Sequence, residues 1–225
     1  MMPQVAVIIV AGGSGTRMQS ALPKQYLPLG GKPVAFYSLE VFAAHPQVVE
    51  IVVVCDPDYR SLFAESFPQV SFASPGFRRQ DSMENGFRQL QSSAEIICVH
   101  DAARPFIDAT MLTNVIQQAH QHGAATVGMP VKYTVKQADH EGFVGHTPDR
   151  SLVWEIQTPQ ALQKGLLKKG LEKVQREKLQ VTDDVSLVEL MGLPVKLVPG
   201  SYSNLKITTP DDLAFAEFFL SKTYT

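Results

Sequence analysis

Apolar runs alternate with amphipathic segments along most of this chain. The runs cover residues 5–10, 48–55, 96–99, 124–131 and 195–198. Runs of this kind are typical of strands that are covered on both faces, as in the parallel sheets of α/β proteins. Between the runs, apolar residues recur at helical spacing, most clearly at Met111, Val115 and Ala119. The alternation predicts right-handed βαβ crossovers and a mostly parallel central sheet with helices on both faces.

Helix signals fall between the apolar runs. We expect helices over residues 33–45, 80–91, 111–119, 158–178, 182–192 and 209–222. The last three begin with a threonine that can cap the first turn, and Thr158 and Thr209 each precede a proline, which is favoured at the first helical position. Gly192 is expected to end the helix that starts at Thr182. These elements predict an α/β fold, a Rossmann-like three-layer sandwich whose ligand site lies at the carboxyl ends of the strands.

The alternation breaks between about residues 131 and 154. Short extended pieces there flank the turn-forming segment 139–142, which predicts a β-hairpin. The segment has little apolar mass and cannot easily bury itself, so we expect a projecting arm that packs on a second subunit. A simple solvated hairpin is the alternative. Apart from this excursion, we expect residues 1–225 to form a single domain.

Composition narrows the class of protein. The chain has 225 residues, of which 44% are hydrophobic and 19% charged, and its net charge is −2. This balance is typical of a folded protein. The sequence has no basic tail for nucleic acid and no run that approaches the ~18 apolar residues of a membrane span, so neither partner is expected. We expect a cytoplasmic protein without a secretory leader, in which Cys55 and Cys98 are buried, reduced thiols.

The first apolar run leads into a glycine-rich loop with two cations. Gly12, Gly13 and Gly15 can present bare N–H groups to phosphate oxygens, and Arg17 and Lys24 add positive charge beside them. The spacing does not fit a P-loop, and a methionine takes the place of the third glycine in a dinucleotide fingerprint. The stretch AGGSGTRM…PKQYLPLGGKP instead resembles the signature loop of nucleotidyltransferases, which wraps the triphosphate of a nucleotide.

A second polar cluster, HDAARP, follows the apolar run at residues 96–99. Asp101 is placed at a carboxyl strand end, where it can reach a ribose hydroxyl or a metal-bound water. The small side chains of Ala102 and Ala103 leave room for a ligand. An ion pair between Asp101 and Arg104 that braces a loop is the alternative interpretation.

Together these motifs closely resemble the 2-C-methyl-D-erythritol 4-phosphate cytidylyltransferase family of the non-mevalonate isoprenoid pathway. The likeness covers nearly the whole chain and extends to residues 76–82, 149–160, 182–184 and 204–208. It implies transfer of a cytidylyl group from CTP to 2-C-methyl-D-erythritol 4-phosphate by in-line displacement of pyrophosphate. Mg²⁺ is the implied cofactor, and the arm is the implied homodimer contact. A phosphomonoester is already mostly dianionic near neutral pH, so the attack needs no strong general base.

The resemblance also implies roles for individual residues. The catalytic cations would be Arg17, Lys24 and Lys206. The nucleotide would be bound by Ala11, Gly12, Gly13, Gly15, Gly76, Ser82, Asp101 and Ala102, and Asp101 would also meet the metal, directly or through water. The methylerythritol phosphate would be bound by Arg104, Thr134, Arg150, Thr158 and Thr182, with Thr134 and Arg150 reaching across the dimer.

Several alternatives stay open at this point. A ribitol-5-phosphate cytidylyltransferase would share the nucleotide half and differ in the acceptor pocket, whereas a nucleotide-binding module would keep the loop without chemistry. Ser82 is also a candidate helix cap, and Lys206 a candidate strand-edge cation. Phe77 and Ser203 stand where the family often has acidic residues, so neither is assigned an acidic role. His100 has no evident partner pattern, and we expect it to be structural.

Overall fold

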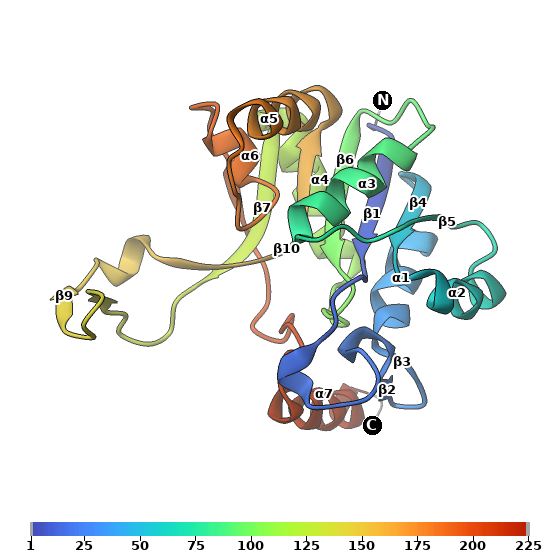
Figure 1. Cartoon of the computed structure of the whole chain (residues 1–225), viewed down its shortest axis with the longest axis horizontal. Helices are drawn as coiled ribbons and strands as arrows, with labels where there is room; N and C mark the ends of the chain where they lie inside the picture. The colour runs from blue at the N-terminus through green and yellow to red at the C-terminus, as the bar shows by residue number, and fades with distance from the viewer. Residues whose placement is uncertain (1, 224–225) are drawn as a thin grey trace.

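A computed structural model describes residues 2–223, which are built around one seven-stranded sheet (Figure 1). The strands lie in the order β11–β7–β10–β6–β1–β4–β5. Their bounds are Val5–Val10 (β1), Val48–Val54 (β4), Ser71–Ala73 (β5), Ile96–Asp101 (β6), Ala124–Pro130 (β7), Trp154–Gln163 (β10) and Lys196–Pro199 (β11). All neighbouring strands are parallel except β10, which runs antiparallel to both β6 and β7. The prediction of a mostly parallel sheet is confirmed.

Helices cover both faces of this sheet. On one face lie α1 (Val34–Ala44), α2 (Arg60–Ser66) and α4 (Ala109–His122), and on the other lie α3 (Arg79–Gln89), α5 (Lys164–Glu177) and α6 (Ser186–Glu189). Ile9 of β1 packs in the same cluster as Leu39 of α1, whereas its neighbour Ile8 packs in the cluster of Met83 of α3. Because successive strand side chains point to opposite faces, an unbroken apolar run contributes to both layers. The three-layer prediction is confirmed.

A smaller layer lies below the sheet in Figure 1, where α7 (Pro210–Thr223) packs against the hairpin of β2 (Pro28–Leu29) and β3 (Lys32–Pro33). The apolar cluster between them contains Leu29 and Ala216 together with Met18 and Ile207. Met18 ends the glycine-rich loop, and Ile207 follows Lys206 in the chain. This layer therefore fixes two segments that carry predicted site cations.

The helix start predicted at Thr158-Pro159 is wrong. These residues lie inside β10, and α5 begins only at Lys164. Leu162 pairs with Ile97 of β6 on one side and with Ala124 of β7 on the other. Because a residue before proline favours extended backbone and both edges of the strand are paired, the sheet outweighs the local capping signal.

The helix predicted over residues 182–192 is also shorter than expected. Only the single turn α6 is helical, and the backbone N–H of its first residue, Ser186, donates to Oδ1 of Asp183 at 3.0 Å. Gly192 follows this turn with a φ of +72°, a conformation that glycine adopts without strain. The helix ends at Glu189, three residues before Gly192, and of the predicted cap signal Thr182-Asp183-Asp184 it is Asp183 that bonds to the first turn.

The predicted β-hairpin arm is present. Its strands are β8 (Gln137–Ala138) and β9 (Val144–His146), which pair antiparallel. Asp139 shapes the turn, since its Oδ1 accepts from the backbone N–H groups of Glu141 and Phe143 at 3.0 and 2.9 Å. Figure 1 shows the arm extending far from the body of the molecule. Apolar side chains on it remain exposed, including Tyr133 at 80% and Phe143 at 68%.

Both cysteines are buried and unpaired, as expected. Burial raises the pKa of the Cys55 thiol to about 11, so it stays protonated at neutral pH.

Within residues 2–223, no helix combines the length and the apolar character that crossing a membrane requires.

Candidate active site

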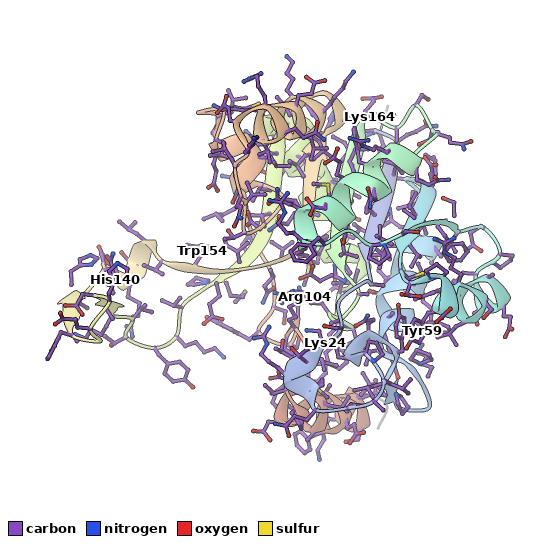
Figure 2. The ribbon with its side chains drawn as sticks, in the orientation of Figure 1. Lys24, Tyr59, Arg104, His140, Trp154 and Lys164 are labelled. Carbon is purple, nitrogen blue, oxygen red and sulfur yellow. The ribbon has the colours of Figure 1, made fainter. Side chains whose placement is uncertain are left out.

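A hollow of about 440 Å³ opens at the carboxyl ends of β1 and β6. Its walls come from the glycine-rich loop, the turn before α3, the end of β6 and the segment between β11 and α7. The predicted site residues that line it are Gly12, Gly13, Gly15, Arg17, Lys24, Gly76, Ser82, Asp101 and Lys206. Figure 2 shows Lys24 near the centre of the molecule and His140 at the far end of the arm. Four segments far apart in the sequence thus meet at one place.

Residues after Lys24 hold the glycine-rich loop in shape. The side-chain amide of Gln25 donates to the carbonyl oxygens of Ala11 and Gly13 at 2.6 and 3.0 Å, and the Tyr26 hydroxyl donates to Ala11 at 2.8 Å. Donors on these oxygens reduce the negative potential of the loop, which favours an anion beside it. Gln25 also lines the hollow and is not among the predicted site residues, although it belongs to the PKQYL segment.

Two loop glycines are required by space and conformation. A Cβ atom at Gly12 would lie 2.4 Å from Cβ of Pro75, and one at Gly15 would lie 3.1 Å from the backbone nitrogen of Lys24. Gly15 also has a φ of +67°, which favours glycine. The loop therefore passes closely between a wall at Pro75 and a wall at Lys24.

Ala11 and Ala102, both predicted to bind nucleotide, lie behind the hollow. The backbone N–H of Ala11 donates to the carbonyl of Val54 at 2.8 Å, and that of Ala102 donates to Val10 at 3.1 Å. Each alanine is 1% exposed. Their donors extend the sheet, so the structure does not bring these two residues into the wall of the site.

The cations in the hollow are crowded. Burial lowers the pKa of Lys24 to about 8, and the positive charges of Lys206 and Arg17 contribute to this shift. A nearby negative charge would favour the protonated amine and raise the pKa again. The electrostatics of the ligand-free site therefore suit a polyanion.

Asp101 is the centre of an ionic network. Its Oδ1 lies 3.0 Å from the guanidinium of Arg79, and its Oδ2 accepts from Nζ of Lys206 at 2.7 Å. Burial alone would raise the pKa of this carboxyl, but the charges of Arg79 and Lys206 outweigh it and hold the pKa well below the usual range. Asp101 is thus ionised at all physiological pH values.

Arg79 joins this network to a second buried carboxylate. Its two terminal nitrogens donate to the two oxygens of Asp184, each at 2.8 Å, while Nε donates to Asp101 at 3.0 Å. The Asp184 side chain is only 1% exposed. Arg79 lies in the segment 76–82 that shares the family likeness, but the sequence predicts no role for it, because its partners lie 22 and 105 positions away along the chain.

Arg104, a predicted acceptor-binding residue, does not line the hollow, and neither does its neighbour His100. Arg104 lies 4.0 Å from Asp101 but donates at 2.8 Å to the carbonyl of Asn204, so the predicted Asp101–Arg104 pair is the weaker contact. Burial lowers the pKa of His100 to about 4, which leaves it neutral at pH 7. Its ring nitrogens contact the carbonyl of Arg104 and the hydroxyl of Thr158, each at 3.0 Å. These contacts agree with the structural role expected for His100.

Thr158, predicted to bind the acceptor, is 4% exposed. Besides its contact with His100, its hydroxyl accepts from the backbone N–H of Asp101 at 3.1 Å. It therefore lies beneath the site and supports the strand end that carries Asp101.

Lys206 lies in the loop between β11 and α7, so it is not a strand-edge cation. The backbone N–H of Ile207 donates to the carbonyl of Ala103 at 2.9 Å, and the buried amide of Asn204 donates to the carbonyl of Thr158 at 2.9 Å. The first bond holds the loop against the HDAARP segment, and the second holds it against β10. The loop thereby holds Lys206 in the lining of the hollow, which it shares with the glycine-rich loop.

The turn before α3 is closed by Ser82. Its hydroxyl accepts from the backbone N–H of Gly76 at 2.9 Å and donates to the carbonyl of Arg78 at 3.2 Å. A Cβ atom at Gly76 would lie 2.4 Å from Cβ of Asp81, so the close approach requires glycine. The serine thus shapes the turn of the predicted base pocket.

Three predicted acceptor-binding residues lie away from this hollow. Thr134 and Arg150 are exposed on the arm, where Arg150 donates to the carbonyl of Lys132 at 3.2 Å. Neither residue lines the hollow, and Figure 1 shows that the arm extends away from the body of the molecule. Thr182 is exposed before α6 and does not line the hollow.

The residues present fit a metal only in part. Across residues 2–223, no group of three or more His, Cys, Asp or Glu side chains is arranged to hold a metal ion. Asp101 is ionised, but both of its oxygens contact cationic side chains. Because Mg²⁺ commonly combines one or two carboxylates with phosphate oxygens and water, the site suits an ion that enters with a triphosphate.

Comparison with known proteins agrees with this geometry. A sequence model of the 2-C-methyl-D-erythritol 4-phosphate cytidylyltransferase family matches residues 5–222. The chloroplastic 2-C-methyl-D-erythritol 4-phosphate cytidylyltransferase of Oryza sativa subsp. japonica is 47% identical over 222 residues, covering 97% of this chain and 75% of that protein. The enzyme of the same name from Caldanaerobacter subterraneus is 42% identical over 97% of this chain and 99% of its own length. A 4-diphosphocytidyl-2C-methyl-D-erythritol synthase structure from Anaerococcus prevotii has a TM-score of 0.87 at 30% identity, covering 98% of this chain and 100% of that one.

Proposed function

Since this chain belongs to the 2-C-methyl-D-erythritol 4-phosphate cytidylyltransferase family, we propose that it transfers the cytidylyl group of CTP to the phosphate of 2-C-methyl-D-erythritol 4-phosphate. The products are 4-diphosphocytidyl-2-C-methyl-D-erythritol, an intermediate of isoprenoid precursor biosynthesis, and pyrophosphate. The observation that carries the proposal is the meeting of the glycine-rich loop, Lys24 and Lys206 in one hollow. The names of the relatives favour this acceptor over ribitol 5-phosphate and describe enzymes, not a non-catalytic binding module.

The proposed catalytic groups are three cations. Arg17 and Lys24 lie beside the glycine-rich loop and would act on the triphosphate, while Lys206 on the opposite wall would meet the α-phosphate or the incoming phosphate. The acceptor phosphate is mostly dianionic near neutral pH and attacks without a general base. The barrier falls because the cations hold two mutually repelling anions in line and stabilise the charge on the departing pyrophosphate.

The proposed contacts to the base and the ribose come from the turn before α3 and from the end of β6. The turn at Gly76 and Ser82 would receive the cytosine, and Asp101 would meet the ribose. Asp101 is also the residue that would hold a divalent cation together with the triphosphate oxygens, where the ion would neutralise developing phosphate charge. Asp101 also accepts a hydrogen bond from Nζ of Lys206 at 2.7 Å, and this contact would hold the lysine at the hollow.

The arm would complete the site across a homodimer. Exposed apolar residues at Tyr133, Phe143 and Leu152 support burial against a second subunit. Thr134 and Arg150 would then bind the methylerythritol phosphate in the partner's hollow, because neither residue lines the hollow of its own chain. Within each subunit, the whole chain would act as a single cytoplasmic nucleotidyltransferase domain.

Pyrophosphate release in the presence of CTP and Mg²⁺ tests the reaction. We expect release that requires 2-C-methyl-D-erythritol 4-phosphate and a coupled product of the corresponding mass. Ribitol 5-phosphate is the matched control, since it presents the same phosphomonoester on a different polyol. Release with ribitol 5-phosphate but not with 2-C-methyl-D-erythritol 4-phosphate would show that the proposed acceptor is wrong. Tight CTP binding without release from either acceptor would indicate a binding module.

A further inference from the structure

Phe77 is an aromatic side chain held in solvent at the rim of the hollow. Its relative exposure of 101% is the highest among the large hydrophobic residues of the described chain, ahead of Tyr133 at 80%. It lines the hollow together with the glycine-rich loop and the cations. Single exposed apolar residues are common on protein surfaces, so exposure alone identifies no ligand. The hydrogen bonds that fix the turn around this ring are more informative.

The turn that carries Phe77 is fastened on both sides. The backbone N–H of Gly76 donates to the hydroxyl of Ser82 at 2.9 Å, and that of Arg78 donates to the carboxylate of Asp81 at 3.0 Å. Both acceptors belong to the first turn of α3. The ring is therefore presented from a fixed turn, at a defined position beside the hollow.

The glycine-rich loop connects Lys24 with the turn that carries Phe77. Gly15 packs against Lys24, whereas Gly12 packs against Pro75, which lies two residues before Phe77 in the chain. The glycine-rich loop thus runs from the cations toward the turn of Phe77. A nucleotide with its phosphates at the cations would extend its base toward this turn.

We propose that Phe77 is a stacking platform for the base of the bound nucleotide, an inference that rests on the proposed function. Aromatic rings stack on any base because every base has a π face, so stacking contributes affinity with little selectivity. Selection of cytosine would remain with the polar groups around Gly76 and Ser82. An apolar ring would therefore assist binding at a position that is often acidic in the family.

Comparing CTP with inorganic tripolyphosphate separates stacking from phosphate binding. In calorimetric titrations, Phe77→Ala should raise the Kd for CTP by between about 5-fold and about 100-fold, and the Kd for tripolyphosphate should not change. Phe77→Leu keeps apolar bulk without a ring face and should also bind CTP weakly, whereas Phe77→Trp should restore affinity. Phe218→Ala is the matched control, since this ring is 60% exposed on α7, and it should leave both ligands unaffected.

The Phe77→Trp variant also reports on the contact directly. Its fluorescence should be quenched by CTP and not by tripolyphosphate, as expected for a base stacked on the indole. The wild-type protein, whose single tryptophan is Trp154 at the root of the arm, supplies the background signal.

Four outcomes separate this inference from the proposed function. If the wild-type protein releases pyrophosphate and Phe77→Ala binds CTP as tightly as the wild-type protein does, the stacking role is wrong and the function stands. Equal loss of tripolyphosphate binding would show that the substitution disrupts the turn, and would also overturn the inference. Loss of the dimer in sedimentation velocity would assign the ring to a protein interface instead. Failure of the wild-type protein to bind CTP would count against the function itself.

Discussion

Replacing Arg79 with methionine should leave a buried carboxylate without its counter-ion. Arg79 donates two hydrogen bonds of 2.8 Å to Asp184, whose side chain is 1% exposed. Removing one partner of a buried ion pair typically costs about 3–5 kcal/mol. Because 27% of the Arg79 side chain is exposed, we expect the lower end of this range, about 3 kcal/mol at pH 7.

The loss should depend on pH. Burial raises the pKa of Asp184, and Arg79 opposes that shift in the wild-type protein. Without Arg79, the folded-state pKa should lie well above the unfolded value of about 3.9. The folded state then binds more protons than the unfolded state between these two values, so the free energy of unfolding falls as pH rises through the window. The deficit of Arg79→Met should therefore be larger at pH 7 than at pH 5.

Urea unfolding followed by circular dichroism at both pH values measures this effect. With a slope of about 3 kcal/mol/M, the midpoint at pH 7 should move by about 1 M. Adding Asp184→Asn to Arg79→Met should recover much of the loss, because no charge is then left buried. Arg88→Met is the matched control on the same helix, since Arg88 is 67% exposed and should lose no more than about 1 kcal/mol. A deficit in Arg79→Met that is below about 1 kcal/mol, or equal at both pH values, would refute the reasoning.

The charges in the hollow and on the arm lead to three further expectations. Arg17→Ala or Lys24→Ala should lower turnover by about 10²-fold or more in a pyrophosphate-release assay, and near wild-type rates in both would contradict the catalytic assignment. Because the pKa of Lys24 is about 8 without ligand, CTP should bind with proton uptake above pH 8 and with falling affinity as pH rises further. Calorimetry in buffers of different ionisation enthalpy measures this uptake, which should disappear in Lys24→Met; uptake that persists there would assign the proton to another group. Arg150→Ala should raise KM for the acceptor and leave CTP affinity intact. Mixing Arg150→Ala with Lys24→Ala should restore about a quarter of wild-type activity, because random exchange gives hybrid dimers with one complete site. No recovery would show that the arm does not act across the dimer.

Local sequence patterns were sufficient for much of the fold and for part of the site. The strand at residues 5–10 and the glycine-rich loop after it were both predicted, since apolar periodicity and glycine spacing act over a few residues. The hairpin at residues 131–154 was recognised in the same way, from alternation around a turn. Lys24 was assigned to the site because it belongs to the same short segment as the loop.

The errors came from segments where neighbours in space outweighed neighbours in sequence. Thr158-Pro159 has the local chemistry of a helix start, but it lies between two paired parts of β10. Residues 154–156 pair with β7, and the residues from Gln160 onward pair with both β6 and β7, so the segment is held in a strand. The Thr158 hydroxyl then bonds to His100 and to the backbone of Asp101, so it cannot cap a helix. The geometry of the sheet, which involves residues more than 30 positions away, decided this element.

In the ionic network of the site, too, the sequence identifies the residues and only the tertiary structure determines their contacts. Sequence alone placed Asp101 at a strand end and Lys206 in a matching motif, and it named both as site residues. Their 2.7 Å contact, and the bridge through Arg79 to Asp184, join residues that are up to 105 positions apart. An ion pair depends on the separation of its charges in space and on their exclusion from water. Both quantities arise only when the strands and the loops at their ends have assembled, and no local pattern of residues encodes them.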